Sequence, residues 1–102
     1  MTLYNKLVRD KIPEIIRRQG SEPMTRVLDD EEYARFLAEK LDEEVAEFHR
    51  DQNIEELADI LEVVFALTAT LGASRDELMD VYEKKHEARG GFEDRVFLIG
   101  KE

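Results

Sequence analysis

Two pairs of carboxylates are the side chains of this sequence best placed to do chemistry. Glu44 and Glu47 lie three residues apart within one helical pattern, and Glu56 and Asp59 have the same spacing at the start of the next. In a helix, this spacing puts both members of a pair on one face, one turn apart. Only eight residues separate Glu47 from Glu56, so antiparallel helices would bring all four carboxylates to one place.

Four carboxylates in one partly buried place require a compensating cation. Like charges raise each other's pKa, and a hard divalent cation such as Mg²⁺, which takes oxygen ligands, resolves the repulsion. A second interpretation stays open, because acidic residues also stabilise the first turn of a helix and the chain holds 25 of them. The metal site is favoured by Glu44, which falls on the apolar stripe of its helix with Leu37, Leu41 and Phe48.

The elements that must position these carboxylates are helices. Apolar periodicity, prolines and glycines predict helices over residues 13–18, 30–50, 54–71 and 74–89. Two further stretches, 24–28 and 95–99, are short and extended in character, and they could pair as small strands.

Polar residues mark where three of these helices begin. Asp29 or Asp30 is the expected N-cap of the long second helix, and Asn53 that of the third. Ser74 with Glu77 predicts a capping box at the start of the fourth helix.

The chain is expected to form one domain, residues 1–102, of the all-α class. The stretch over 54–71 is apolar on nearly every side after Asp59, which is typical of a helix buried on several sides. A chain of this size has little other material with which to cover such a helix. We therefore expect a small helical bundle that joins a second copy, as a homodimer or higher homo-oligomer, into a larger bundle.

Composition excludes several classes of protein. The net charge of −10 argues against a nucleic-acid binder, which needs a basic face to neutralise phosphates. The absence of cysteine excludes disulfides, thiolate metal sites and cysteine nucleophiles. The first ten residues lack the apolar core of a signal peptide, and the run over 60–71 is too short to span a membrane. We expect a cytoplasmic protein with no membrane partner.

Three blocks of sequence carry a resemblance to a known family. The acidic block is Glu43-Glu44-x-x-Glu47 followed by Glu56-x-x-Asp59, and the other two are KHEARGGF over 85–92 and YNKLVRDKIP over 4–13. Together they resemble the MazG-like family of all-α nucleoside triphosphate pyrophosphohydrolases, in its short, stand-alone form. The resemblance covers most of the chain.

The resemblance implies a reaction and a set of site residues. The reaction is Mg²⁺-dependent hydrolysis between the α and β phosphates of a nucleoside triphosphate, giving the monophosphate and pyrophosphate, with Mn²⁺ as an alternative metal. The implied metal ligands are Glu44, Glu47, Glu56 and Asp59. Glu43 would orient the attacking water as a catalytic residue or support a ligand. The implied substrate-binding residues are Lys85, Arg89, Lys6 and Arg9.

The sequence departs from the family pattern at three places. The interval between the acidic pairs is shorter than is usual, so the helix connection must be tight. Glu83 stands where many relatives carry an asparagine, which removes one route to the base or ribose. Glu62 interrupts the apolar run after Asp59, either as an extra ligand or base or as a satisfied buried or interface carboxylate.

Two alternatives remain beside the leading hypothesis. Phosphoribosyl-ATP pyrophosphohydrolase shares the acidic pattern, but that family tends to carry a histidine shortly after its second acidic motif, and none follows Asp59 here. A non-catalytic helical dimer that regulates or binds a partner is the other. A degenerate enzyme would be expected to lose a carboxylate or a basic residue of the site, and none is missing, which favours the enzyme.

Overall fold

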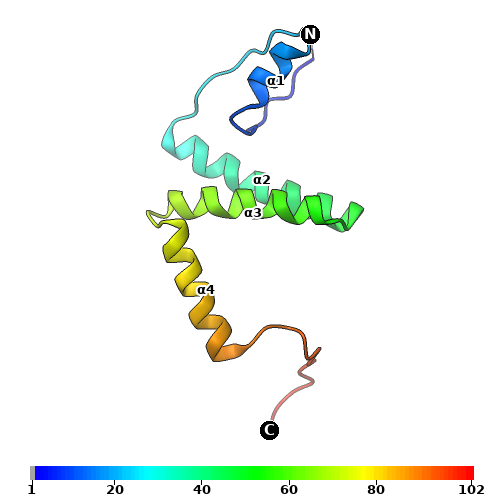
Figure 1. Cartoon of the computed structure of the whole chain (residues 1–102), viewed down its shortest axis with the longest axis vertical. Helices are drawn as coiled ribbons and strands as arrows, with labels where there is room; N and C mark the ends of the chain where they lie inside the picture. Colours follow the sequence, from blue (N-terminus) through cyan, green and yellow to red (C-terminus); the bar gives the residue numbers. More distant parts are fainter. Residues whose placement is uncertain (1) are drawn as a thin grey trace.

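The computed structural model describes residues 2–102 and is all-α, as the sequence predicts. Figure 1 shows its four helices: α1 (Ile12–Arg18), α2 (Asp30–Asp51), α3 (Ile54–Thr70) and α4 (Arg75–Arg89). Each lies within two residues of its predicted bounds. Helices α2 and α3 fold back on each other as an antiparallel hairpin, and this hairpin is the centre of the structure.

The strands predicted over 24–28 and 95–99 are wrong, because residues 2–102 contain no strand. The first stretch connects α1 to α2 on one side of the hairpin, whereas the second lies beyond α4 on the opposite side (Figure 1). A strand requires a neighbour that pairs with its backbone N–H and C=O groups. Neither stretch has such a neighbour, so both are irregular and mostly exposed, and Arg95 has a left-handed φ of +58°.

Side-chain caps fix the ends of the helices. Asp29 caps α2 and forms a full capping box, in which Asp29 Oδ1 accepts from the Glu32 amide at 2.8 Å and Glu32 Oε1 accepts from the Asp29 amide. At the start of α4, Ser74 Oγ accepts a hydrogen bond from the Glu77 amide at 3.1 Å. The Glu77 carboxylate accepts from the Ser74 hydroxyl, and not from the Ser74 amide as a full capping box requires. The predicted N-caps are therefore confirmed, with the fourth helix using half of its box.

A turn of two residues, Gln52 and Asn53, connects α2 to α3. Gln52 has φ of +47°, in the left-handed region, and its amide donates to the Phe48 carbonyl at 2.8 Å. Asn53 then caps α3 by accepting from the Glu56 amide at 3.0 Å. Two residues thus reverse the chain and set the first turn of α3 against the last turns of α2.

The core of the single chain is small. Leu37 of α2 and Val63 of α3 are the buried apolar side chains among residues 2–102, and α2 and α3 pack on each other. The apolar face of α3 that carries Ile54, Leu57 and Leu61 stays exposed. The radius of gyration is 18.0 Å, against about 13 Å for a compact domain of this length. The accessible surface is 9344 Å², where a folded monomer of this size has about 6,000 Å².

Helices α1 and α4 extend away from the hairpin. Helix α4 leaves α3 at an angle of 108° after a turn at Gly72, whose φ is +78°, and contacts α3 only near this corner. Helix α1 does not pack directly on the other three. Among residues 2–102, no single helix is long and apolar enough to cross a bilayer; the bent pair of α3 and α4 meets that test by length and composition alone.

Replacing Asn53 with alanine should lower the free energy of unfolding by about 1 kcal/mol, because the first turn of α3 loses the acceptor for the Glu56 amide. Urea unfolding at fixed protein concentration measures this change. Asn53→Asp retains the acceptor and serves as the matched control. Equal stability of the alanine and aspartate variants would show that the cap contributes nothing to the hairpin.

Candidate metal centre

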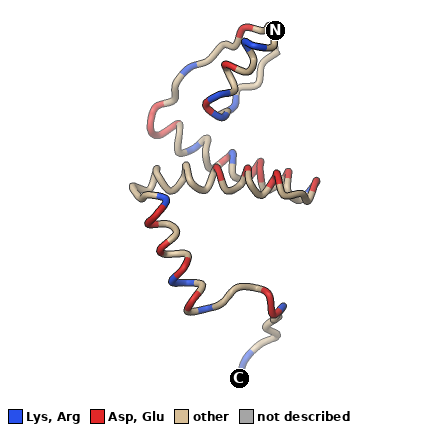
Figure 2. Tube along the Cα trace, viewed as in Figure 1, with Lys and Arg blue, Asp and Glu red and all other residues tan. Residues whose placement is uncertain are grey.

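The structure brings together the four carboxylates that the spacing predicts. Glu44, Glu47, Glu56 and Asp59 each offer one oxygen, and these four atoms all lie within 4.8 Å of one another. The first pair comes from the second half of α2 and the other from the first turns of α3. We call this set the carboxylate cluster. Figure 2 shows acidic residues gathered along this part of the hairpin.

The size of the carboxylate cluster fits a divalent cation with oxygen ligands. Ligands on opposite sides of an octahedral Mg²⁺ lie about 4.2 Å apart, given metal–oxygen distances of about 2.1 Å. The observed limit of 4.8 Å exceeds this by a few tenths of an ångström, which rotation of glutamate side chains can supply. Two of the oxygens, Glu44 Oε2 and Glu56 Oε2, are buried and have no hydrogen-bond partner. Such unpaired buried acceptors are rare in folded proteins and fit a site that takes a cation.

Burial and mutual repulsion raise the pKa of two members of the carboxylate cluster. Glu44 is 7% exposed, and burial is the main cause of its raised pKa, followed by the neighbouring carboxyl of Glu47. Lys40 opposes this rise and Asp59 adds to it. Burial also raises the pKa of Glu56, with smaller contributions from Glu47, Asp51 and Asp59. A divalent cation would favour the ionised form of both groups.

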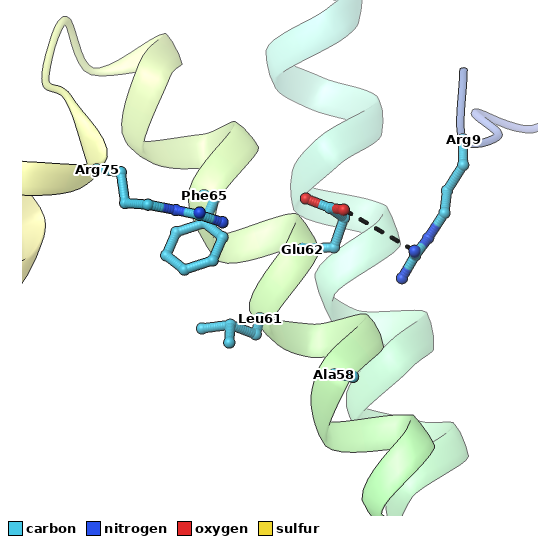
Figure 3. A pocket seen from close by; sticks show the side chains of 6 residues that line it. All are labelled: Arg9, Ala58, Leu61, Glu62, Phe65 and Arg75. Carbon is cyan, nitrogen blue, oxygen red and sulfur yellow. Dashed lines mark ion pairs between the residues drawn. The ribbon is translucent and has the colours of Figure 1, made fainter. Parts of the chain in front are cut away.

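Basic side chains of residues 2–11, which precede α1 and which we call the N-terminal segment, border the carboxylate cluster on one side. Arg9 Nη2 donates to Asp59 Oδ1 at 2.6 Å, and Arg9 Nη1 lies 3.8 Å from Glu62 Oε1, the ion pair drawn in Figure 3. Lys6 Nζ lies 3.9 Å from Glu43 Oε1. Both predicted substrate-binding residues of this segment are therefore at the site, although they are distant from it in sequence.

Lys40 is a residue of the site that the sequence reasoning missed. Its Nζ lies 3.5 Å from Glu43 Oε2 and 3.5 Å from Glu44 Oε1. The signal was present in the spacing, because a lysine three and four residues before two glutamates shares their helix face. Glu43 thus lies between two lysines at the edge of the carboxylate cluster.

Glu62 is not a buried carboxylate. Its side chain is more than half exposed, and it lies one turn after Asp59, where Arg9 bridges the two. Glu62 therefore holds the Arg9 guanidinium at the edge of the carboxylate cluster.

The two basic residues predicted on the fourth helix are not brought to the carboxylate cluster within one chain. Helix α4 diverges from α3, and Lys85 lies about 15 Å and Arg89 about 21 Å along it from Arg75. Both side chains are exposed. The spacing of these residues fixes their common helix face but not the direction in which that helix leaves the hairpin.

Comparisons with known proteins give the chain a relative but no family. No family model matches the sequence, and no solved structure matches it. A protein of Mycolicibacterium smegmatis, whose printed name is "Uncharacterized protein", is 60% identical over 42 residues. These residues are 41% of this chain and 43% of that protein, so the chain spans less than half of the curated relative it matches.

The raised pKa values of Glu44 and Glu56 predict how stability depends on pH. A carboxyl whose pKa is higher in the folded state contributes stability below its ordinary value of 4.5 and loses that contribution as the pH rises through the raised value. In chelator, the melting temperature should therefore fall as the pH rises from 4.5 through the raised pKa of Glu44, and more steeply than in Glu44→Gln. Magnesium should reverse the loss, by about 2.7 kcal/mol at one hundred times its Kd. A melting temperature indifferent to Mg²⁺ at pH 7 would contradict the metal centre.

Proposed function

We propose that this chain is a Mg²⁺-dependent nucleotide pyrophosphohydrolase, which cleaves a nucleoside triphosphate between its α and β phosphates. The observation that supports the proposal most is the convergence of Glu44, Glu47, Glu56 and Asp59 within 4.8 Å, with two of their buried oxygens unpaired. The resemblance of the acidic pattern and its flanking blocks to the MazG-like family supports the same reaction. Removal of unwanted nucleotides from the cytoplasmic pool is the role that fits it.

The proposed chemistry divides between a metal and the surrounding cations. Mg²⁺, or Mn²⁺ in its place, would neutralise charge that develops on the phosphate oxygens and lower the pKa of an attacking water. The carboxylate cluster would hold the metal. Glu43, which lies 3.9 Å from Lys6 Nζ and 3.5 Å from Lys40 Nζ, would orient the water for attack on the α phosphorus.

The basic residues at the rim would receive the phosphates. Arg9 and Lys6 lie within ion-pair distance of carboxylates at the site, so a triphosphate bound there would meet their guanidinium and ammonium groups. Arg9 now donates to Asp59, one of the residues that would hold the metal, and its guanidinium would turn to the phosphates when substrate binds. Pyrophosphate would leave with its charge balanced by these same side chains and the metal.

A second copy of the chain belongs to this proposal. The exposed surface exceeds that of a compact monomer by more than 3,000 Å², which is enough for a large obligate interface. The apolar outer face of α3, with the shallow depression floored by Leu61 and Phe65 in Figure 3, is the natural place for it. A homodimer would also give α4, with Lys85 and Arg89, a partner hairpin to reach.

Pyrophosphate release from a panel of canonical and modified nucleoside triphosphates, with Mg²⁺ and with chelator, tests the reaction. Glu44→Gln and Asp59→Asn should each reduce Mg²⁺-dependent release by at least about 100-fold, since each removes a ligand charge while keeping the side chain's shape. Glu55→Gln, which removes a neighbouring charge outside the carboxylate cluster, should retain activity. Full activity in either cluster variant would remove the metal assignment. If the folded wild type released no pyrophosphate from any nucleotide of the panel, phosphoribosyl-ATP as substrate or the non-catalytic dimer would be favoured.

The homodimer is tested by placing a charge on the outer face of α3. Leu61→Lys should shift the mass measured by light scattering from dimer to monomer, because a lysine ammonium would have to be buried in an apolar interface. Val27→Lys introduces the same charge at a residue that is 97% exposed and away from this face, and should leave the dimer intact. A monomeric wild type would exclude the assembly outright.

A further inference from the structure

A cavity of about 510 Å³ lies beside the carboxylate cluster, between the hairpin and the N-terminal segment. Its floor includes Leu37, Val63 and Ala66 of the hairpin, and its roof includes Leu7, Val8 and Ile12. Small-molecule sites in proteins occupy about 300–1,000 Å³ and are lined mainly by apolar side chains with a few polar groups at fixed places. This cavity has that size, and eight of its fifteen lining residues are apolar or aromatic while the other seven are charged.

The chemical character of the cavity changes along α2. Tyr33, Leu37, Lys40 and Glu44 all line it and follow one stripe of the helix, at intervals of four, three and four residues. The stripe runs about 16 Å from an aromatic and apolar end, past one cation, to a carboxylate. On the α3 side, Asp59 lines the acidic end and Ala66 the apolar end. Whatever fills the cavity therefore has an apolar end and an end that faces the carboxylate cluster.

The roof of the cavity is attached to the hairpin through the site itself. The backbone of α1 stays clear of α2 and α3, and α1 reaches the cavity through the side chains of Ile12 and Ile15. The segment before α1 is held to the hairpin by polar contacts, the Arg9 hydrogen bond to Asp59 and the Lys6 ion pair to Glu43. The segment that encloses the apolar end is thus positioned by residues at the acidic end.

We infer that this cavity holds the nucleoside half of the substrate, with the base against Leu37, Val63 and the Val8 side of the N-terminal segment. The inference rests on the proposed function for the placement of the phosphates at the carboxylate cluster. A metal with an inorganic polyphosphate would leave the apolar end of the stripe empty, whereas a nucleotide presents an apolar base, a sugar and phosphates in the order that the stripe requires. The N-terminal segment is therefore a wall of the substrate pocket.

Filling the apolar end of the cavity tests this assignment by binding, independently of turnover. Ala66→Phe adds a ring to the floor of the cavity, and Ala69→Phe adds the same ring at an exposed position one turn further along α3. Affinities are measured calorimetrically, with Mg²⁺, for α,β-methylene nucleoside triphosphates and for inorganic tripolyphosphate, which has no base. Ala66→Phe should weaken binding of the nucleotide analogues at least about tenfold and leave tripolyphosphate unchanged. Ala69→Phe should alter neither.

Because Ala66→Phe could disturb folding, a second variant tests the cavity from its opposite wall. Val8→Ser makes the roof polar and should weaken the analogues selectively, whereas Leu3→Ser, in the same segment but outside the cavity, should not. An equal loss for analogue and tripolyphosphate, an unchanged analogue affinity, no analogue binding by the wild type, or a change of oligomeric mass without a change of affinity would each overturn the inference. The last result would assign the cavity to a segment of the second copy.

The two proposals fail in different ways. Selective loss of analogue binding in Ala66→Phe, with a wild type that releases no pyrophosphate, would retain the nucleoside pocket and exclude the hydrolase. Pyrophosphate release that survives with unchanged nucleotide affinity in both cavity variants would retain the hydrolase and place the base elsewhere.

Discussion

The repulsion among four carboxylates at one end of a helix hairpin is the force that the rest of the site must balance. The hairpin cannot relieve it by opening, because only Gln52 and Asn53 join α2 to α3. The protein's own cations offset part of it, with Lys40 beside Glu44 and Arg9 beside Asp59. Glu47 and Glu56 have no lysine or arginine within 4.0 Å in the part of the chain that the structure describes. The imbalance is greatest on the side that the N-terminal segment does not cover.

The same hairpin links the site to the shape of the whole chain. One face of α3 meets α2 and forms the small core around Leu37 and Val63, while the opposite face remains apolar and uncovered. A helix with two apolar faces is stable in water only when both are covered. Two members of the carboxylate cluster, Glu56 and Asp59, therefore belong to the same helix as the exposed apolar face, so anything that packs on the outer face of α3 also steadies these two carboxylates.

Local features of the structure followed from the sequence, and distant ones did not. The i, i+3 spacing and the short connection place the four carboxylates together because helix periodicity and a tight turn are both local. Arg9 and Asp59 are 50 residues apart in the sequence, so periodicity could not predict their contact. Only the resemblance of the N-terminal block indicated that Arg9 belongs to the site. Lys40 is a local exception, because its place three and four residues before Glu43 and Glu44 was within reach of the same spacing rule.

The incorrect strands and the position of α4 have the same origin. A β-branched, apolar stretch such as 95–99 becomes a strand only when another segment lies alongside, and nothing within the stretch itself records where that segment is. The direction of α4 depends in turn on the left-handed backbone at Gly72, which the sequence marks as a helix end without giving the angle that follows. Both are questions of chain trajectory, which side-chain patterns describe poorly.

The two-residue turn at Gln52 and Asn53 also has a consequence for how the molecule folds. All four carboxylates belong to residues 44–59, so the loop that must close to assemble them is among the shortest available, and hairpin closure on this scale takes microseconds or less. Contacts this local favour a transition state in which the α2–α3 hairpin is already formed. Charge repulsion would then act on the folding barrier itself, and the proposed divalent cation would speed folding while leaving the rate of unfolding nearly unchanged.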